Sequence, residues 1–159
     1  MKPRLYLETT IPSYLVARRS RDAILHGQQA ATRKWWDERR GDYELFLSEF
    51  VDLEAGRGDA EMAVARAAAL EGLPRLAATE DARKLAVEIL SAGLIPAHAA
   101  VDASHIAVAA VHRMDILLTW NCTHSITSPS AGRSSAFARG RAGPVLPFAP
   151  RSTCWNLEP

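Results

Sequence analysis

The sequence has little of what secreted or membrane proteins require. It contains two cysteines, Cys122 and Cys154, which is too few for a disulfide framework. No apolar run reaches the roughly 18 residues that a membrane-spanning helix needs. Lys2 and Arg4 lead into only a short apolar stretch, so a signal-peptide hydrophobic region is also missing. We therefore expect a cytoplasmic protein that does not bind a membrane.

A strong charge of either sign is missing as well. The formal net charge is +1 at pH 7, which argues neither for nor against a nucleic-acid partner. The 159 residues, 48% of them hydrophobic and 23% charged, suit one globular domain with a substantial core. A glycine-rich phosphate loop does not follow the first expected strand, so a nucleotide-binding regulator of flavodoxin type is a poor alternative.

Strands and helices are expected to alternate up to about residue 120. Apolar runs predict strands at 4–7, 43–48, 73–77 and 115–120. Helical spacing, with Asp59 and Thr79 as N-caps, predicts helices at 21–40, 49–55, 62–70, from Thr79 to Gly93, and at 100–111. Such alternation is typical of an α/β fold with a mostly parallel sheet.

The composition changes after His124. Serine, glycine, proline and arginine dominate residues 125–159, and acidic residues are absent until Glu158. We therefore divide the chain into a domain at 1–124 and an atypical, poorly ordered segment at 125–159. Within that segment, residues 144–148 are the best candidate for an edge strand, although Pro147 weakens it.

Four acid or amide positions fall where a strand is expected to end or a helix to begin: Glu8, Glu54, Asp102 and Asn121. In an open α/β sheet, ligands bind beyond the carboxyl ends of the strands. Oxygen side chains that converge there can hold Mg²⁺ or Mn²⁺, and such an ion can activate water against a phosphodiester.

Each position also has a purely structural interpretation. Glu8 can favour a helix dipole, Glu54 can be a solvated surface acid, and Asn121 can be a turn residue. Asp102 is the strongest of the four, because it stands in the first turn of a markedly apolar helix, where an acid needs a partner; a helix-capping acid is its alternative.

Other polar residues accompany these four. Thr9 and Thr10 can contact a phosphate oxygen or metal-bound water, or act as plain caps. His105, one turn after Asp102, can orient that acid, touch the ligand, or be a core histidine. Trp35 and Trp36 lie among basic residues and can stack on single-stranded RNA, although the favoured interpretation is that one is a core residue and the other contacts a partner.

Together these stretches resemble the PIN-domain nucleases, in particular the bacterial branch that includes the toxins of toxin–antitoxin pairs. The similar stretches cover roughly residues 4 to 124, and they are LYLETTIPSYL at 5–15, WWDERR at 35–40, SEFV at 48–51 with Glu54, GLIP at 93–96, VDASHIA at 101–107 and LLTWNCTH at 117–124.

The resemblance implies a three-layer α/β/α sandwich around a short, mostly parallel sheet and an acidic pocket for Mg²⁺ or Mn²⁺. By the same resemblance, Glu8, Glu54 and Asp102 are the metal ligands and Asn121 completes the catalytic set. Thr10 occupies the small hydroxyl position after the first acid. The implied activity is metal-dependent cleavage of RNA, with a small antitoxin protein as partner and a homodimer as the assembly.

The chain departs from the family at two places. The first acid in the family is almost always aspartate, and here it is Glu8, whose extra methylene moves the carboxylate by about 1.5 Å. The segment after His124 does not resemble the helix and last strand that usually follow. These departures keep a second hypothesis open, in which the chain is a catalytically weak module that binds RNA or a protein.

Overall fold

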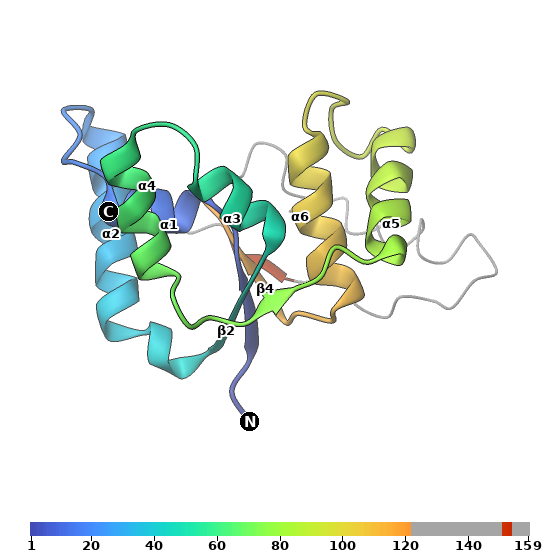
Figure 1. The fold of residues 1–159 in the computed structure, drawn as a ribbon, viewed down its shortest axis with the longest axis horizontal. Helices are drawn as coiled ribbons and strands as arrows, with labels where there is room; N and C mark the ends of the chain where they lie inside the picture. Colours follow the sequence, from blue (N-terminus) through green and yellow to red (C-terminus); the bar gives the residue numbers. More distant parts are fainter. Residues whose placement is uncertain (122–150, 154–159) are drawn as a thin grey trace.

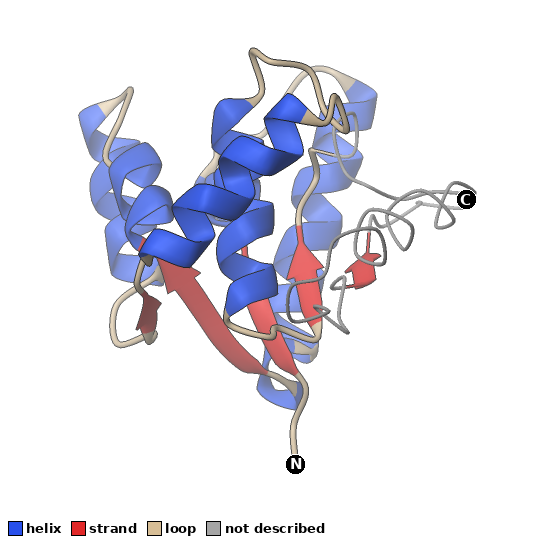
Figure 2. Cartoon of the chain, turned by 90° about the vertical axis from the view of Figure 1, so that its right-hand side faces the viewer, coloured by secondary structure: helices blue, strands red, loops and turns tan. Residues whose placement is uncertain are grey.

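The computed structural model describes residues 1–121 and 151–153 of the chain. In these residues a parallel sheet of five strands has the order β3-β2-β1-β4-β5. Their bounds are β1 Arg4–Leu7, β2 Glu44–Ser48, β3 Arg75–Leu76, β4 Ile116–Leu118 and β5 Arg151–Thr153. Because every pairing is parallel, all the carboxyl ends lie along one edge of the sheet, toward which the arrows point in Figure 2.

Helices cover both faces of this sheet. They are α1 Thr10–Val16, α2 Ala23–Glu38, α3 Glu49–Ala55, α4 Ala60–Ala69, α5 Glu80–Ser91 and α6 Ala100–Val111, with a short 3₁₀ turn, η1, at Arg40–Asp42. Figure 1 shows α1, α2 and α4 on one side of the strands and α5 and α6 on the other. The predicted α/β fold with three α/β/α layers is confirmed. None of the described helices is long and apolar enough to cross a membrane.

Local sequence signals explain where several helices begin. The side chain of Asp59 accepts a hydrogen bond from the backbone of Met62, and Thr79 accepts one from Ala82, so both predicted N-caps are confirmed. Asp22 caps α2 in the same way, by accepting from Leu25. The helix predicted at 21–40 is therefore shorter at both ends.

The core is built on the two central strands. Leu5 and Leu7 of β1 and Leu117 and Leu118 of β4 are buried, because helices cover both faces of the sheet. The same burial leaves Tyr6, in the middle of β1, with no exposed surface. A buried tyrosine needs a partner for its hydroxyl group, and this partner lies in the candidate site.

The strand order creates a switch point between β1 and β4. From β1 the chain proceeds outward through β2 to β3, and then crosses to β4 on the other side of β1. Ligands of open α/β sheets bind in the crevice at such a point. The loops after Leu7 and Leu118 flank it.

The segment 125–159 agrees less well with the structure expected from the sequence. Strand β5 lies in the segment 125–159 and pairs in parallel with β4, and the sequence did not predict it. Its three residues lack the apolar pattern of a buried strand, so the sequence alone does not predict a strand there. The strand predicted at 144–148 lies outside the described residues, and the domain boundary at 124 stays a prediction.

Candidate functional site

Glu8 follows β1 directly and lies beside the switch point. Its carboxylate is almost fully buried, with 7% of the residue exposed. The Oε2 atom accepts hydrogen bonds from the Thr10 backbone amide at 3.0 Å and from the hydroxyl groups of Thr10 and Thr119, the latter at 2.8 Å. A buried carboxylate is costly without such donors, so this environment is built for an anion.

The same two threonines join the ends of β1 and β4. The Thr10 hydroxyl accepts a hydrogen bond from the backbone of Trp120 at 2.9 Å, and the Thr119 hydroxyl accepts one from the backbone of Asn121 at 2.8 Å. Each hydroxyl therefore donates to Glu8 and accepts from the chain after β4. The result is a fixed crevice floor, in which the acid and both loops hold one another in place.

Glu54 reaches the crevice from α3, whose first residue follows β2. Its Oε2 atom accepts hydrogen bonds from the Thr9 hydroxyl at 2.5 Å and from Nε2 of His105 at 2.9 Å. Burial raises the pKa of the Glu54 carboxyl, but the bonds from His105 and Thr9 and the positive charge of Arg57 hold the pKa below its ordinary value. Glu54 is therefore an anion at neutral pH.

His105 connects Glu54 to the core. The residue is 1% exposed, and its Nδ1 atom lies 2.7 Å from the hydroxyl oxygen of Tyr6, which lies 2.6 Å from the hydroxyl oxygen of Ser48. With Ser48 donating to Tyr6 and Tyr6 donating to Nδ1, the proton on Nε2 points at Glu54. Burial raises the pKa of Tyr6, which keeps its phenol protonated as this arrangement requires.

Three side chains gather closely enough to be candidates for a cation site, and of these the two carboxylates are the available ligands, because both ring nitrogens of His105 are hydrogen-bonded. One ligand atom each from Glu8, Glu54 and His105 lies within 4.8 Å of the others. Among the described residues, every hydrogen bond to the two carboxylates reaches Oε2, which leaves each Oε1 with its lone pairs. Neither Oε1 atom is both buried and unpaired. In the described part of the chain, the buried side-chain atom without a hydrogen-bond partner is Nδ1 of His26. Two open carboxylate oxygens suit Mg²⁺ or Mn²⁺.

Asp102 and Asn121 form a second pair in the same crevice. The Asn121 side-chain amide lies 3.0 Å from both carboxylate oxygens of Asp102 and donates to them. Asp102 is in the first turn of α6, as predicted. Both residues line one pocket together with Glu8, His105 and Thr119. Asp102 is not part of the 4.8 Å group found among the described residues.

The structure thus brings the predicted site residues to one edge of the sheet and divides them into two sets. Glu8 and Glu54 lie together, and His105 joins them instead of orienting Asp102. Asp102 lies with Asn121. The interpretation of Thr9 as a plain cap is wrong, since its side chain makes no capping bond and donates to Glu54.

Sequence reasoning missed the residues that support the acids. Tyr6, Ser48 and Thr119 are all buried and all hydrogen-bonded to a site residue. A signal for Tyr6 was present, because a polar hydroxyl in an apolar buried strand demands a partner. Ser48 and Thr119 carry no such signal, since hydroxyl residues are common where strands end.

Trp35 and Trp36 are both core residues, so the favoured interpretation is confirmed for one of them and wrong for the other, and the alternative of RNA stacking is wrong for both. The two residues are 5% and 7% exposed and belong to the main hydrophobic core. Helix α2 turns both toward the sheet, and Thr32, one turn earlier, is buried with them. Neither Trp35 nor Trp36 leaves an indole face for a base.

Comparison with known proteins adds no assignment: no protein-family model matches the chain, and no curated protein matches it.

Proposed function

We propose that the chain is a metal-dependent ribonuclease that hydrolyses RNA phosphodiester bonds. The observation that carries this proposal is the meeting of Glu8, Glu54 and His105 within 4.8 Å at the switch point, beside Asp102 and Asn121. Carboxylates gathered in this way repel one another unless hydrogen bonds and a cation compensate. Hydrogen bonds account for one oxygen of each glutamate, and the open oxygens favour a cation for the rest.

The proposed roles follow from these contacts. Glu8 and Glu54 would hold Mg²⁺ or Mn²⁺ through Oε1, with Asp102 completing the acidic lining. When bound, such an ion lowers the pKa of water and neutralises charge on a phosphate oxygen. Thr10 and Thr119 fix the Glu8 carboxylate. His105 keeps Glu54 oriented and ionised. Asn121 fixes Asp102 through its side-chain amide.

A cleavage assay on mixed RNAs with Mn²⁺ tests the proposal. We expect cleavage that EDTA stops and that added Mn²⁺ restores. Asp102→Asn should abolish cleavage while the thermal unfolding midpoint stays close to that of the parent protein, because the amide preserves the shape of the side chain. Asp81→Asn, at an exposed first-turn acid of α5, is the matched control and should cleave normally. Full activity in Asp102→Asn would sink the mechanism.

A second candidate is a catalytically weak module that binds RNA or a protein. The bond between His105 and Glu54, and the three bonds on Glu8 Oε2, favour it, because they already satisfy part of the site without an ion. Calorimetry with Mn²⁺ separates the two candidates. The nuclease should bind Mn²⁺ with an affinity that Glu8→Gln lowers, and the weak module should show no such pocket-dependent binding.

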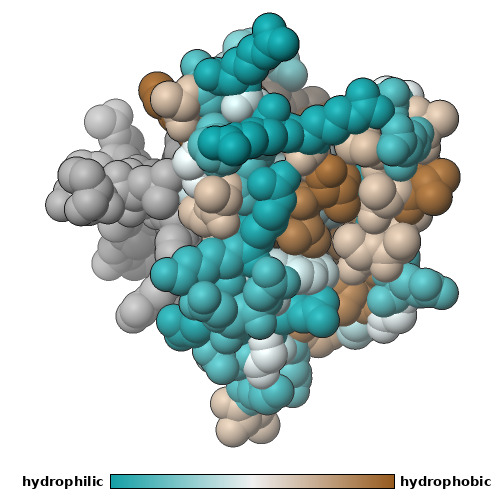
Figure 3. Space-filling view, turned by 90° about the vertical axis from the view of Figure 1, so that its left-hand side faces the viewer, coloured by the Kyte–Doolittle hydropathy of each residue, from teal (hydrophilic) through white to brown (hydrophobic). Residues whose placement is uncertain are grey.

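The partners remain proposals too. We propose a toxin restrained by a small antitoxin, acting on cytoplasmic RNA, and forming a homodimer. Trp35 and Trp36 do not supply an apolar contact surface for a partner, because both are buried. Figure 3 instead shows an apolar patch bordered by polar side chains on the side of the molecule that carries α2 and α4. Ile24 of α2 and Val64 of α4 are 74% and 71% exposed. Sedimentation of the purified chain would test self-association.

A further inference from the structure

An aromatic pair lies beside the candidate site. Tyr14 of α1 and Trp120, two residues after β4, have ring centroids 6.3 Å apart and ring planes inclined by 24°, so the rings are stacked. Both residues are half-buried, which leaves part of each side chain at the surface. The fully buried Trp35 and Trp36 differ in this respect.

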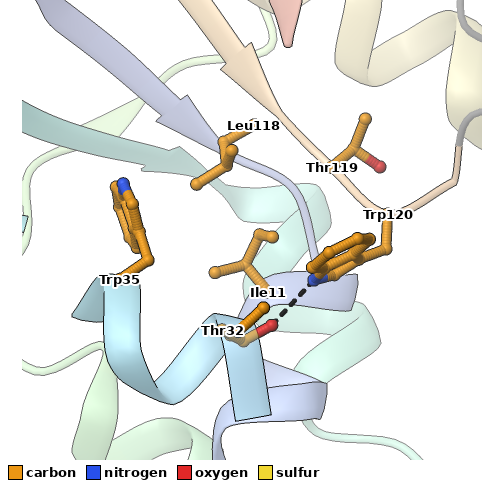
Figure 4. A pocket seen from close by; sticks show the side chains of 7 residues that line it. Ile11, Thr32, Trp35, Leu118, Thr119 and Trp120 are labelled. Atoms are coloured by element: carbon orange, nitrogen blue, oxygen red, sulfur yellow. Dashed lines mark hydrogen bonds between the residues drawn. The ribbon is translucent and has the colours of Figure 1, made fainter. Parts of the chain in front are cut away.

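The indole of Trp120 is held rigidly. Its Nε1 atom donates to the Thr32 hydroxyl at 2.7 Å, the bond drawn in Figure 4. That hydroxyl in turn donates to the carbonyl oxygen of Gln28 at 2.8 Å. Behind the indole, Ile11 and Leu118 line a narrow apolar pocket. A side chain fixed in this way loses little rotamer freedom when a ligand binds, so its contacts contribute more to affinity.

The pair is continuous with the acidic crevice. The backbone amide of Trp120 donates to the Thr10 hydroxyl, and the same hydroxyl donates to Glu8. The next residue, Asn121, binds Asp102. The indole of Trp120 lines the neighbouring pocket on the side of α2, and Thr119 lines both that pocket and the acidic one, so the aromatic pair adjoins the acidic crevice through Thr10 and Thr119.

We propose that Tyr14 and Trp120 form a stacking platform for one nucleobase of single-stranded RNA, next to the phosphate that occupies the acidic crevice. This inference rests on the proposed function. Uncharged aromatic faces suit a base, because every base has a π-face and stacking is worth about 1–3 kcal/mol per base. Double-stranded RNA is a poor occupant, since its bases are already stacked within the helix.

The experiment measures binding in EDTA, so that no cleavage is needed. The probe is a short fluorescent single-stranded oligoribonucleotide, together with a series that lacks one base at successive positions. The parent protein should bind about 5-fold or more weakly when one particular base is missing. Tyr14→Leu should bind the complete probe more weakly by a similar factor and should lose the preference for that base.

Matched variants separate stacking from general damage. Tyr43→Leu changes a half-buried tyrosine before β2, at the other edge of the sheet, and should bind as the parent does. Trp120→Phe keeps an aromatic face and should retain the preference for the base in part. Equal binding by Tyr14→Leu, with the base preference intact, would overturn the platform. So would an absence of binding by the parent protein.

The remaining outcomes distinguish this inference from the proposed function. If the base preference depends on Tyr14 but no RNA is cleaved with Mn²⁺, the platform stands and the nuclease proposal fails. If RNA is cleaved but Tyr14→Leu binds normally, the nuclease stands and the platform fails. If Tyr14→Leu changes the sedimentation of the protein while it binds RNA normally, the pair belongs to a contact between copies, and the inference is overturned.

Discussion

Nε2 of His105 lies 2.9 Å from Oε2 of Glu54, and this bond joins a buried ring to an acid at the rim of the crevice. The side chain of His105 is 2% exposed and that of Glu54 is 27% exposed. The other ring nitrogen is bound to Tyr6, in the centre of the sheet. The position of the Glu54 carboxylate is therefore set by the core through His105, and by Thr9 from the neighbouring loop.

Removal of the Tyr6 hydroxyl tests this dependence. Tyr6→Phe leaves the buried atoms of Ser48 and His105 without a shared partner, and it should lower the free energy of unfolding by about 1–3 kcal/mol. Urea denaturation at neutral pH measures this loss of unfolding free energy. Tyr43→Phe is the matched control, because Tyr43 is half-buried and lies outside this chain of bonds; it should be close to neutral. Equal effects of the two changes would contradict the assigned role of the hydroxyl.

The low pKa of Glu54 predicts a dependence of stability on pH. A carboxyl whose folded pKa lies below its unfolded value stabilises the protein fully above the ordinary value of 4.5. That contribution is lost as the pH falls through the folded pKa. The difference in unfolding free energy between the parent and Glu54→Gln should therefore be largest near neutral pH and should shrink below about pH 4.5.

Denaturant titrations across this pH range supply the measurement. Glu71→Gln, at an exposed acid, should show a difference that hardly changes with pH, since exposed charges contribute little. If the Glu54→Gln difference grew instead as the pH fell, the sign of the assigned pKa shift would be wrong.

A substitution at Glu8 tests whether the crevice is shaped for glutamate or for the shorter aspartate. Three donors from Thr10 and Thr119 meet on one oxygen of Glu8. Glu8→Asp would draw the carboxylate back by about 1.5 Å and away from the Thr119 hydroxyl. We expect a loss of about 1–3 kcal/mol in unfolding free energy and a weaker affinity for Mn²⁺ in calorimetry. A variant as stable as the parent, with stronger Mn²⁺ binding, would show that the crevice is shaped for aspartate.

The fold was largely predictable because its signals are local. Strand β1 has the predicted bounds, as do α3 and α6, since apolar runs and turn residues delimit each of them. Asp59 and Thr79 marked helix starts by their own chemistry. The order of the strands in the sheet was less accessible, because it depends on which helices cover which face. Strand β5 carries no apolar signal and was missed.

The location of the candidate site was predictable from the sequence, but the contacts among its side chains were less so. Parallel strands bring their carboxyl ends to one edge, so Glu8 and Asn121 were expected at the same edge of the sheet. The division into a glutamate pair with His105 and an Asp102–Asn121 pair depends on side-chain directions across two helices and two loops. Sequence spacing places His105 one turn from Asp102, and tertiary packing turns it toward Glu54 instead.

Arg57 follows α3, and its positive charge helps to lower the pKa of Glu54, which supports a prediction about RNA affinity. The residue is exposed and its charge acts on Glu54. Its backbone is fixed, because its amide donates to the carbonyl oxygen of Glu54 at 3.0 Å and its carbonyl oxygen accepts from Arg66 at 2.5 Å. Gly58, with φ of 83°, supplies the turn that follows. The fixed backbone keeps this charge close enough to act on Glu54, and we expect the same charge to attract a substrate phosphate under the proposed function.

Arg57→Ala should therefore weaken the binding of single-stranded RNA and reduce its salt dependence. Loss of one phosphate contact lowers the slope of log affinity against log salt by about 0.7 for a single strand. Fluorescence anisotropy in EDTA at several salt concentrations measures that slope without cleavage. Arg40→Ala is the matched control, because Arg40 is also exposed but lies over the Trp36 ring, before β2 and at the opposite edge of the sheet. If both variants changed the slope equally, the charge at residue 57 would act through the overall field of the protein and not through a contact at the crevice.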